Sequence, residues 1–238
     1  EVNNLNAGRR SNSGTGSQTA ALCIAGGEAP NFTAAVEDYN GTSWTEVASL
    51  NLARGYAPGS SGTITAALCI GGKCDTPSPN TTTAAVEDYN GTCWTEVNAL
   101  NAVRYNGAGA GVQSSTLYAG GGNGSPTLDT NESYDGTSWS EEAVLNTGRH
   151  ALGGTGDTNT NVLVFGGTSP ETGKTEFWNG TAWTEVADLA APTEDFTSSA
   201  PGGGTSALKG SGNVNGVRSG ATESWNAAAY QTKTVTIS

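Results

Sequence analysis

Short apolar runs recur along the chain, and each of them ends in glycine. AALCI occurs at residues 20–24 and again at 66–70, and NVLVF at residues 161–165 is followed by Gly166 and Gly167. A continuous apolar run of this length, bounded by turn residues, predicts a strand that is covered on both faces. No stretch shows the 3.6-residue apolar period of a convincing helix. The pattern therefore predicts an all-β chain.

A second segment, AAVEDYNGTSWTEV at residues 34–47, predicts a hairpin. Its first half is rich in β-forming residues. Asn40-Gly41 is the strongest short hairpin signal, because both residue types tolerate the positive φ of a type I′ turn. A further strand is expected to begin at Trp44. With the small, Gly-rich segment that precedes each apolar run, one unit contains four predicted strands.

This unit repeats. Residues 33–51 and 83–101 are identical at 16 of 19 positions, and weaker copies follow at 131–146, 175–190 and 221–238. Glycine pairs keep the same period at residues 26–27, 71–72, 121–122 and 166–167, with a degraded copy near 210–212. The chain is therefore predicted to be one domain, residues 1–238, with a lead-in or closure segment at 1–8 and repeats at approximately 9–53, 54–103, 104–148, 149–192 and 193–238.

An apolar run, a glycine pair, a tyrosine about 12 residues on and a tryptophan five residues later resemble the kelch repeat. The WD40 pattern fits less well, since no repeat carries Gly-His or Trp-Asp. The resemblance implies a β-propeller with blades packed around a central channel. The expected fold is a five-bladed kelch-like β-propeller with four antiparallel strands in each blade. The fifth repeat departs from the pattern, because it lacks a clean glycine pair and has Tyr230 at the tryptophan position.

The sequence leaves open how the ring closes. EVNNLN at residues 1–6 matches the tail of a fourth strand whose tryptophan is missing. We favour closure by residues 1–8 beside a C-terminal strand at residues 234–237. The alternative is a further blade upstream.

Charge and composition limit the classes of partner that the protein can bind. Ten Lys and Arg against 22 Asp and Glu give a net charge of −12. Such a protein neutralises few phosphates, so we expect no nucleic-acid partner, and an anionic membrane would repel it for the same reason. No apolar run is long enough for a spanning helix, so no membrane insertion is expected. A single histidine excludes any site that needs two imidazoles from this chain, including the copper centre of the copper-radical oxidases, which share the kelch-like propeller.

The candidate binding residues are arginines at the start of four of the repeats, in the connections that lead from the fourth strand of one unit to the first strand of the next. In a four-stranded blade these connections share a face with the variable loops at residues 28–31, 73–80, 123–130 and 169–174. Because a guanidinium group can bind a carboxylate through two parallel hydrogen bonds, the arginines are a candidate site for a carboxylate-bearing ligand or partner. The alternative, which we favour, is a salt bridge between blades to a repeated glutamate. In the last repeat Thr193 occupies the position of the arginine. The candidate residues are Arg9, Arg54, Arg104, Arg149 and His150, which follows Arg149.

The other repeated residues are interpreted as structural. Glu37-Asp38 and Glu87-Asp88 could suggest a glycosidase, which needs two carboxylates a fixed distance apart. Consecutive residues of a strand point to opposite faces, however, so a structural role is expected for both pairs. The tyrosines and tryptophans are expected to fill the space between blades rather than to stack on sugars. The DTNTN run at residues 157–161 offers oxygens to calcium, yet such hairpins are common without metal.

The cysteines give no compelling disulfide. We read Cys23 and Cys69 as buried free thiols, and expect Cys74 and Cys93 at opposite ends of the second blade. No catalytic residue, cofactor or metal site is therefore predicted.

Two classes of function remain. The near-identical blades and the Thr-, Asn- and Gly-rich sequence are similar to kelch-like repeat proteins of bacteriophage virions. The first expectation is a non-enzymatic structural or adhesive module, extracellular or in a virion (tail fibre, baseplate or capsid decoration). Its partners would be other virion or surface proteins, a second copy, or a cell-surface glycan. The alternative is a secreted or surface lectin-like propeller with equivalent pockets in at least four blades; a cytosolic adaptor is a third, less favoured possibility.

Overall fold

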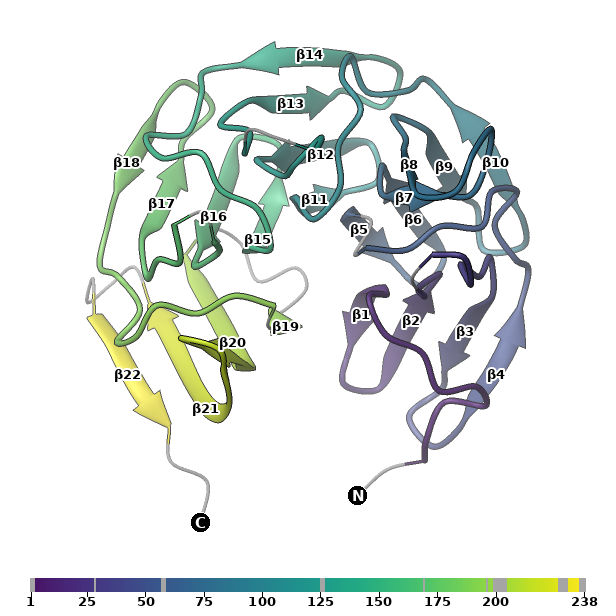
Figure 1. Ribbon diagram of the computed structural model, residues 1–238, viewed down its shortest axis with the longest axis horizontal. Coiled ribbons are helices and arrows are strands. Elements are labelled where there is room, and N and C mark those ends of the chain that lie inside the picture. The colour runs from purple at the N-terminus through teal and green to yellow at the C-terminus, as the bar shows by residue number, and fades with distance from the viewer. Residues whose placement is uncertain are drawn as a thin grey trace.

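The computed structural model describes residues 3–27, 29–56, 59–124, 127–168, 170–195, 197–198, 205–226 and 231–235. These residues form small antiparallel sheets arranged as a propeller (Figure 1). The expected all-β class and the expected four-stranded antiparallel blades are confirmed. Tyr230 lies outside the described residues.

The first two sheets follow the predicted strand pattern. The first contains β1 (Ser13–Ser17), β2 (Ala20–Ile24), β3 (Val36–Tyr39) and β4 (Trp44–Val47). The second contains β5 (Gly59–Thr63), β6 (Ala66–Ile70), β9 (Val86–Tyr89) and β10 (Trp94–Val97), and its long loop adds the small hairpin of β7 (Lys73–Cys74) and β8 (Thr81–Thr82).

The remaining sheets have the same strand order. The third contains β11 (Ala108–Val112), β12 (Ser115–Ala119), β13 (Asn131–Tyr134) and β14 (Trp139–Glu142). The fourth contains β15 (Gly153–Thr158), β16 (Asn161–Phe165), β17 (Thr175–Trp178) and β18 (Trp183–Glu185). The last contains β19 (Thr197–Ser198), β20 (Ser206–Val214), β21 (Val217–Asn226) and β22 (Gln231–Val235), so its second and third strands are longer than their counterparts.

The core lies between neighbouring sheets. Leu68 and Ile70 of β6 pack against Tyr134 and Trp139 of the third sheet, and each of these four side chains is buried. The same arrangement joins the first sheet to the second, the third to the fourth and the fourth to the last. The interpretation of the repeated aromatic residues as filling between blades is therefore confirmed for the second, third and fourth sheets and for Trp225, whereas Tyr39 and Trp44 belong to none of these clusters.

The glycine pairs connect the blades, and the structure corrects their register. The equivalent positions have φ near +60° followed by φ of 100° or more, a backbone that favours glycine. The N–H of the second residue donates to the arginine carbonyl of the next repeat, as from Gly72 to Arg104 at 2.9 Å. By these criteria the pairs in the first and third repeats begin one residue earlier than expected. The equivalent pairs are Ala25-Gly26, Gly71-Gly72, Gly120-Gly121, Gly166-Gly167 and Ser211-Gly212.

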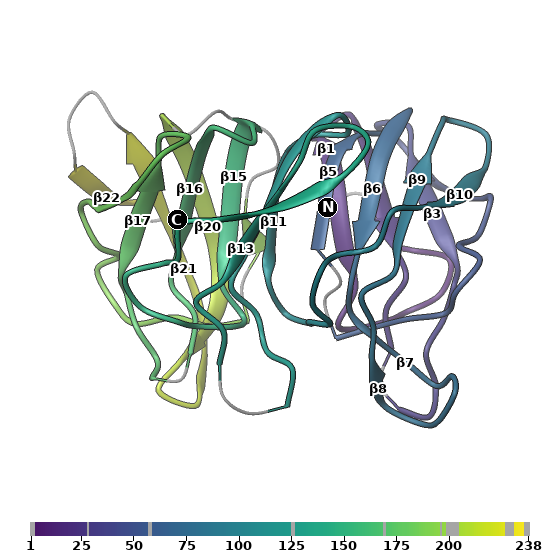
Figure 2. The same cartoon turned by 90° about the horizontal axis from the view of Figure 1, so that it is seen from above.

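One side of the ring collects the longest loops. The β7–β8 hairpin and the turn between β20 and β21 project from the same side, the lower one in Figure 2. The connections that lead into each sheet lie there too, because the residue after each arginine pairs with the residue after the glycine pair of the same repeat, as Gly55 with Lys73. We call this side the loop face. It carries residues 9–12, 54–56, 104–107, 149–152 and 193–195 together with the loops after the second strands.

Around the axis, the innermost strands contact one another in the order β1, β5, β11, β15 and β19. In Figure 1 the ribbons of the first and last sheets do not lie side by side, and among the described residues no contact comparable to that between β1 and β5 joins β1 to β19. Residues 3–8 lie on the first sheet, where the Asn6 N–H donates to Glu37 Oε2 at 2.7 Å. Residues 1, 2, 236 and 237 of the expected closure lie outside the described part of the chain, so that closure stays a prediction.

Candidate functional site

Each candidate arginine is held inside the protein by a glutamate. Arg54 is fully buried, and its Nη2 is hydrogen-bonded to Glu87 Oε1, while its Nη1 donates to the carbonyl of Ala85 at 2.7 Å. The second carboxylate oxygen of Glu87 accepts from the backbone N–H of Asn51 at 2.6 Å and from its side chain at 2.9 Å. We call this arrangement of arginine, glutamate and asparagine the clip. It fastens the connection that leaves the first sheet to the third strand of the second sheet.

The clip recurs in every sheet that an arginine precedes. In the fourth sheet Arg149 Nη1 lies 2.9 Å from Glu176 Oε1, and burial lowers the pKa of this guanidinium despite the neighbouring carboxylate. The ion pairs are Arg9–Glu37, Arg54–Glu87, Arg104–Glu132 and Arg149–Glu176. All four guanidinium groups are thus already bound to a carboxylate and shielded from solvent. The geometry favours a salt bridge to the repeated glutamate over a site open to a ligand. The expected placement between blades is wrong, because each arginine pairs with the glutamate of its own repeat.

His150 belongs to a different environment, because its imidazole is half-buried on the loop face. Its ring centroid lies 6.4 Å from that of Tyr105, and Tyr105 lies 6.1 Å from Tyr56. Tyr56 in turn lies 5.9 Å from Phe32 at an edge-to-face angle. Four aromatic rings from four consecutive repeats therefore form an arc on this face.

A lysine completes the arc. Lys73 Nζ lies 4.2 Å from the ring centroid of Tyr105 and 4.9 Å from that of Tyr56, within cation–π range of both. Burial lowers the pKa of this ammonium group from its ordinary value. Backbone hydrogen bonds of 2.9 and 3.0 Å to Gly55 fix the position of its main chain. We call Phe32, Tyr56, Lys73, Tyr105 and His150 the aromatic patch.

Backbone hydrogen bonds hold the patch in place. The Asn106 N–H donates to the Tyr56 carbonyl at 3.2 Å, and the Ala151 N–H donates to the Asn106 carbonyl at 2.8 Å. Tyr56, Asn106 and Ala151 are equivalent in their repeats, and all three have φ between 54° and 56°. A non-glycine residue in this left-handed conformation costs energy, and it persists only when the surroundings impose it. Main-chain hydrogen bonds thus join the connections that carry Tyr56, Tyr105 and His150.

The patch is not repeated around the ring. The position immediately after the arginine, or after Thr193, is occupied by a different residue type in each repeat: Arg10, Gly55, Tyr105, His150 and Glu194. Sequence reasoning found His150 but missed Phe32, Tyr56, Lys73 and Tyr105. The sequence signal that could have pointed to the patch is the variation of residue type at fixed positions within otherwise near-identical repeats.

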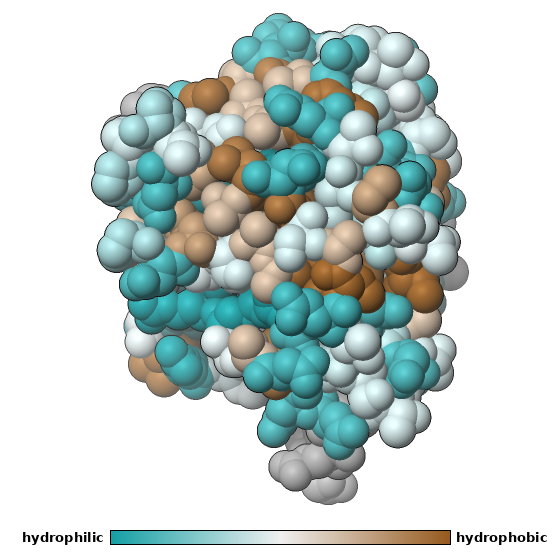
Figure 3. Space-filling view, turned by 90° about the vertical axis from the view of Figure 1, so that its right-hand side faces the viewer, coloured by the Kyte–Doolittle hydropathy of each residue, from teal (hydrophilic) through white to brown (hydrophobic). Residues whose placement is uncertain are grey.

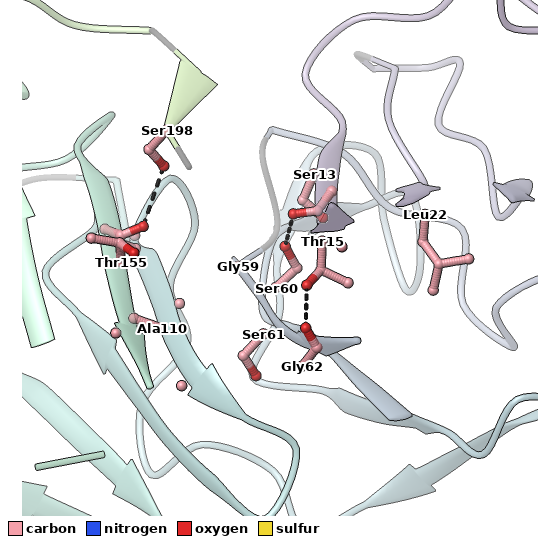
Figure 4. Close-up of a pocket in the computed structure, with 18 of the residues that line it drawn as sticks. Ser13, Thr15, Leu22, Gly59, Ser60, Ser61, Gly62, Ala110, Thr155 and Ser198 are labelled. Carbon is pink, nitrogen blue, oxygen red and sulfur yellow. Dashed lines mark hydrogen bonds between the residues drawn. The ribbon is translucent and has the colours of Figure 1, made fainter. Parts of the chain in front are cut away.

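The central channel has a different character. A cavity of about 470 Å³ is lined by the Gly- and Ser-rich innermost strands (Figure 4). Two of its hydroxyls donate to backbone carbonyls, Thr15 Oγ1 to Gly62 at 2.6 Å and Ser60 Oγ to Gly14 at 2.8 Å, and Ser61 Oγ pairs with Thr116 Oγ1 at 2.7 Å. The described residues that line the cavity carry no charged side chain. The channel therefore offers small neutral groups that are largely engaged with the backbone.

In the acidic pair Glu87-Asp88 the two side chains point in different directions, as expected for consecutive strand residues. Glu87 is hydrogen-bonded to Arg54 of its own repeat, whereas Asp88 accepts a hydrogen bond from Gln113 of the next repeat. In the DTNTN hairpin the Asp157 carboxylate accepts from the Asn161 amide at 2.8 Å. Among the described residues no group of three or more His, Cys, Asp or Glu side chains gathers as metal ligands do.

The cysteines lie where they were expected. Cys23 and Cys69 are buried free thiols. Cys74 is buried in the β7–β8 hairpin, and Cys93 is exposed beside the turn between β9 and β10.

The outer surface shows no broad apolar area on the side that carries β4 and β10. There, apolar side chains form small patches among polar ones (Figure 3). The part of the chain that the structure describes contains no helix able to cross a bilayer. No protein-family model matches the chain, and no curated protein is significantly similar to it in sequence.

Proposed function

We propose that this chain is a non-enzymatic structural or adhesive module, a kelch-like propeller whose last sheet is a fifth blade. We place it outside the cell or in a bacteriophage virion, as part of a fibre, baseplate or capsid decoration. The observation that carries the proposal is the aromatic patch, a single composite surface on the loop face. Binding surfaces of this kind combine stacking rings with a few placed polar groups.

The patch suits an acidic glycan of a cell surface. Tyr56 and Tyr105 present ring faces and edges to a sugar, and Lys73 brings positive charge to a protein of net charge −12. A carboxylate on the sugar would meet this ammonium group in a charge-assisted hydrogen bond. Lys73, on the same face, would thus bind the carboxylate-bearing ligand for which the buried arginines were first considered.

The lectin-like alternative is less well supported. It requires equivalent pockets in at least four blades, and the residues of the patch differ from repeat to repeat. A single site fits an attachment or assembly component better, because such a component gains its multivalency from copies in the particle rather than from blades.

The test is binding of the purified chain to an array of bacterial-envelope and acidic glycans. The variant Lys73→Ala/Tyr105→Ala is compared with Lys174→Ala, which removes an exposed lysine that pairs with Glu185 on the outer edge of the fourth sheet. We expect saturable binding that weakens at least about tenfold in the patch variant and is unchanged in the control. Absence of binding by the folded chain, or equal binding by all three proteins, would contradict a glycan-adhesive role.

A further inference from the structure

The turns between the third and fourth strands of the first four sheets share one arrangement. In the first sheet the Asn40 side-chain oxygen Oδ1 accepts the backbone N–H groups of Thr42 and Ser43, each at 3.0 Å. We call the two donors of such a turn the N–H pair. In the next three sheets an N–H pair contacts the corresponding oxygen at 2.8–2.9 Å, and these residues are Asn90, Asp135 and Asn179. All four residues are exposed to solvent.

In the third sheet the oxygen that contacts the N–H pair belongs to a carboxylate. Asp135 occupies there the position that is asparagine in the other three turns. The N–H groups of Ser138 and Thr137 lower the pKa of this carboxyl from its ordinary value, so they stabilise negative charge on the oxygen that they contact. The turn therefore accepts an acidic side chain and favours its charged form.

Each of the three asparagines is followed by a glycine with an accessible nitrogen. Gly41 and Gly91 are exposed, and Gly180 is half-buried. Among the described residues, none of these three glycine N–H groups donates to a protein acceptor. Because glycine has no Cβ, its nitrogen can approach the side-chain carbon of the preceding residue closely.

We propose that these turns promote the spontaneous deamidation of Asn40, Asn90 and Asn179. In the first turn the Gly41 nitrogen loses its proton to solvent base and attacks Asn40 Cγ, and negative charge develops on Oδ1, which faces the N–H pair. Donors that are already aimed at a developing oxyanion lower the barrier to such a step. The bond from Cγ to Nδ2 then breaks, and this nitrogen takes up protons from solvent and leaves as ammonia. Water opens the resulting succinimide ring and leaves an aspartate or an isoaspartate.

The aspartate product fits the turn. Asp135 Oδ1 lies 2.8 Å from both nitrogens of its N–H pair, so a carboxylate at this position keeps both hydrogen bonds. Isoaspartate adds a carbon atom to the main chain and shortens the side chain, so it would not make the same contacts. Each deamidation adds one negative charge to a protein whose net charge is already −12. Because neighbouring strands are antiparallel, these turns lie at the end of each sheet opposite to the loop face, away from the aromatic patch.

The chain contains a matched comparison for this chemistry. Asn215-Gly216 is the same dipeptide, and both of its residues are exposed. The Asn215 backbone N–H donates to Glu171 at 2.7 Å, but among the described residues no N–H pair contacts its side-chain oxygen. Dipeptide and exposure are therefore the same as at Asn40, and the N–H pair is the difference.

Peptide mapping by mass spectrometry during incubation in mildly alkaline buffer tests the proposal. In the folded chain we expect Asn40, Asn90 and Asn179 to be deamidated several times faster than Asn215. In urea the N–H pairs are lost, and this difference in rate should disappear. The proposal is wrong if Asn215 reacts as fast as the other three in the folded chain, or if the same order of rates persists in urea.

Two variants test whether the turn accepts the product. At pH 7, Asn40→Asp should keep the thermal midpoint at or above that of the native chain, because a carboxylate accepts both hydrogen bonds with the assistance of its charge. Asn40→Ala removes the acceptor and should lower the midpoint. An equal loss in the two variants would show that the N–H pair does not stabilise a carboxylate at this position, and it would overturn the proposal.

Discussion

Lys209 stands directly across the β20–β21 pairing from Glu223, and its Nζ lies 3.6 Å from the carboxylate. Both side chains are buried. Glu223 is the repeated glutamate of the last sheet, where Thr193 takes the place of the arginine. In the last sheet the cation that pairs with this glutamate therefore comes from the second strand, whereas in the other sheets it comes from the preceding connection. A buried carboxylate without a cationic partner would strongly destabilise the fold.

The first prediction concerns this substituted pair. Lys209→Val places at this site the residue that occupies the equivalent position in β16, Val164, and leaves Glu223 buried without a cation. We expect a loss of about 3–5 kcal/mol in the free energy of unfolding, measured by urea denaturation. The double variant Lys209→Val/Thr193→Arg should regain most of that loss, since it restores the arginine–glutamate pair of the other four repeats, while the Ala190 N–H already donates to Glu223 Oε2. No recovery would mean that the connection before the last sheet cannot hold an arginine as the others do.

The second prediction concerns acid. Burial opposes ionisation of Glu37, but the Asn6 N–H and the charge of Arg9 outweigh it, so its pKa lies below the ordinary value of 4.5. Because the folded pKa is the lower one, ionisation of Glu37 favours folding. Its contribution is present above the unfolded pKa and is lost as the pH falls through the folded pKa. The difference in unfolding free energy between the native chain and Glu37→Gln should therefore shrink below about pH 4.5. A difference that is constant from pH 7 to pH 3 would contradict this assignment.

The third prediction concerns the glycine pairs. Gly71 has φ +63°, and a Cβ placed there would lie 2.5 Å from the carbonyl oxygen of Arg104. Gly71→Ala should destabilise the fold by at least about 1–2 kcal/mol from the left-handed backbone alone, with the contact adding to that. Gly220→Ala is the control, because nothing lies within 4 Å of its Cβ position. Thermal unfolding of the two variants should separate them clearly, and similar midpoints would refute the close approach of the sheets at Gly71.

The fourth prediction concerns thiol reactivity. Cys93 is exposed, whereas Cys23, Cys69 and Cys74 are buried, and burial raises the pKa of Cys69 to about 11. Because the thiolate is the reactive form, one thiol should react rapidly with iodoacetamide at pH 8. The other three should react only after unfolding. Mass spectrometry of the labelled chain checks this, and Cys93→Ser should remove the rapid reaction. Rapid labelling of a second cysteine would show that a buried strand opens readily.

Local pattern accounts for most of the fold. Asn-Gly turns, apolar runs before glycine and the Tyr and Trp positions each specify structure within a few residues, and their repetition excludes other arrangements. The sequence also showed that each arginine recurs in step with a glutamate. This was enough to favour a salt bridge, but it did not show the asparagine that completes the clip.

The functional surface depends on tertiary structure. The strands, the turns and the period could be predicted from the residues alone, because these features depend on neighbours along the chain. It could not place Phe32, Tyr56, Lys73, Tyr105 and His150 together, since up to 118 residues separate them (150 minus 32) and only the curvature of the ring brings them to one face. Nor could it show that the guanidinium groups are shielded while Lys73 stays partly accessible. Burial is a property of the packed sheets, so the charges that remain within reach of a partner can be identified only once the sheets are packed together.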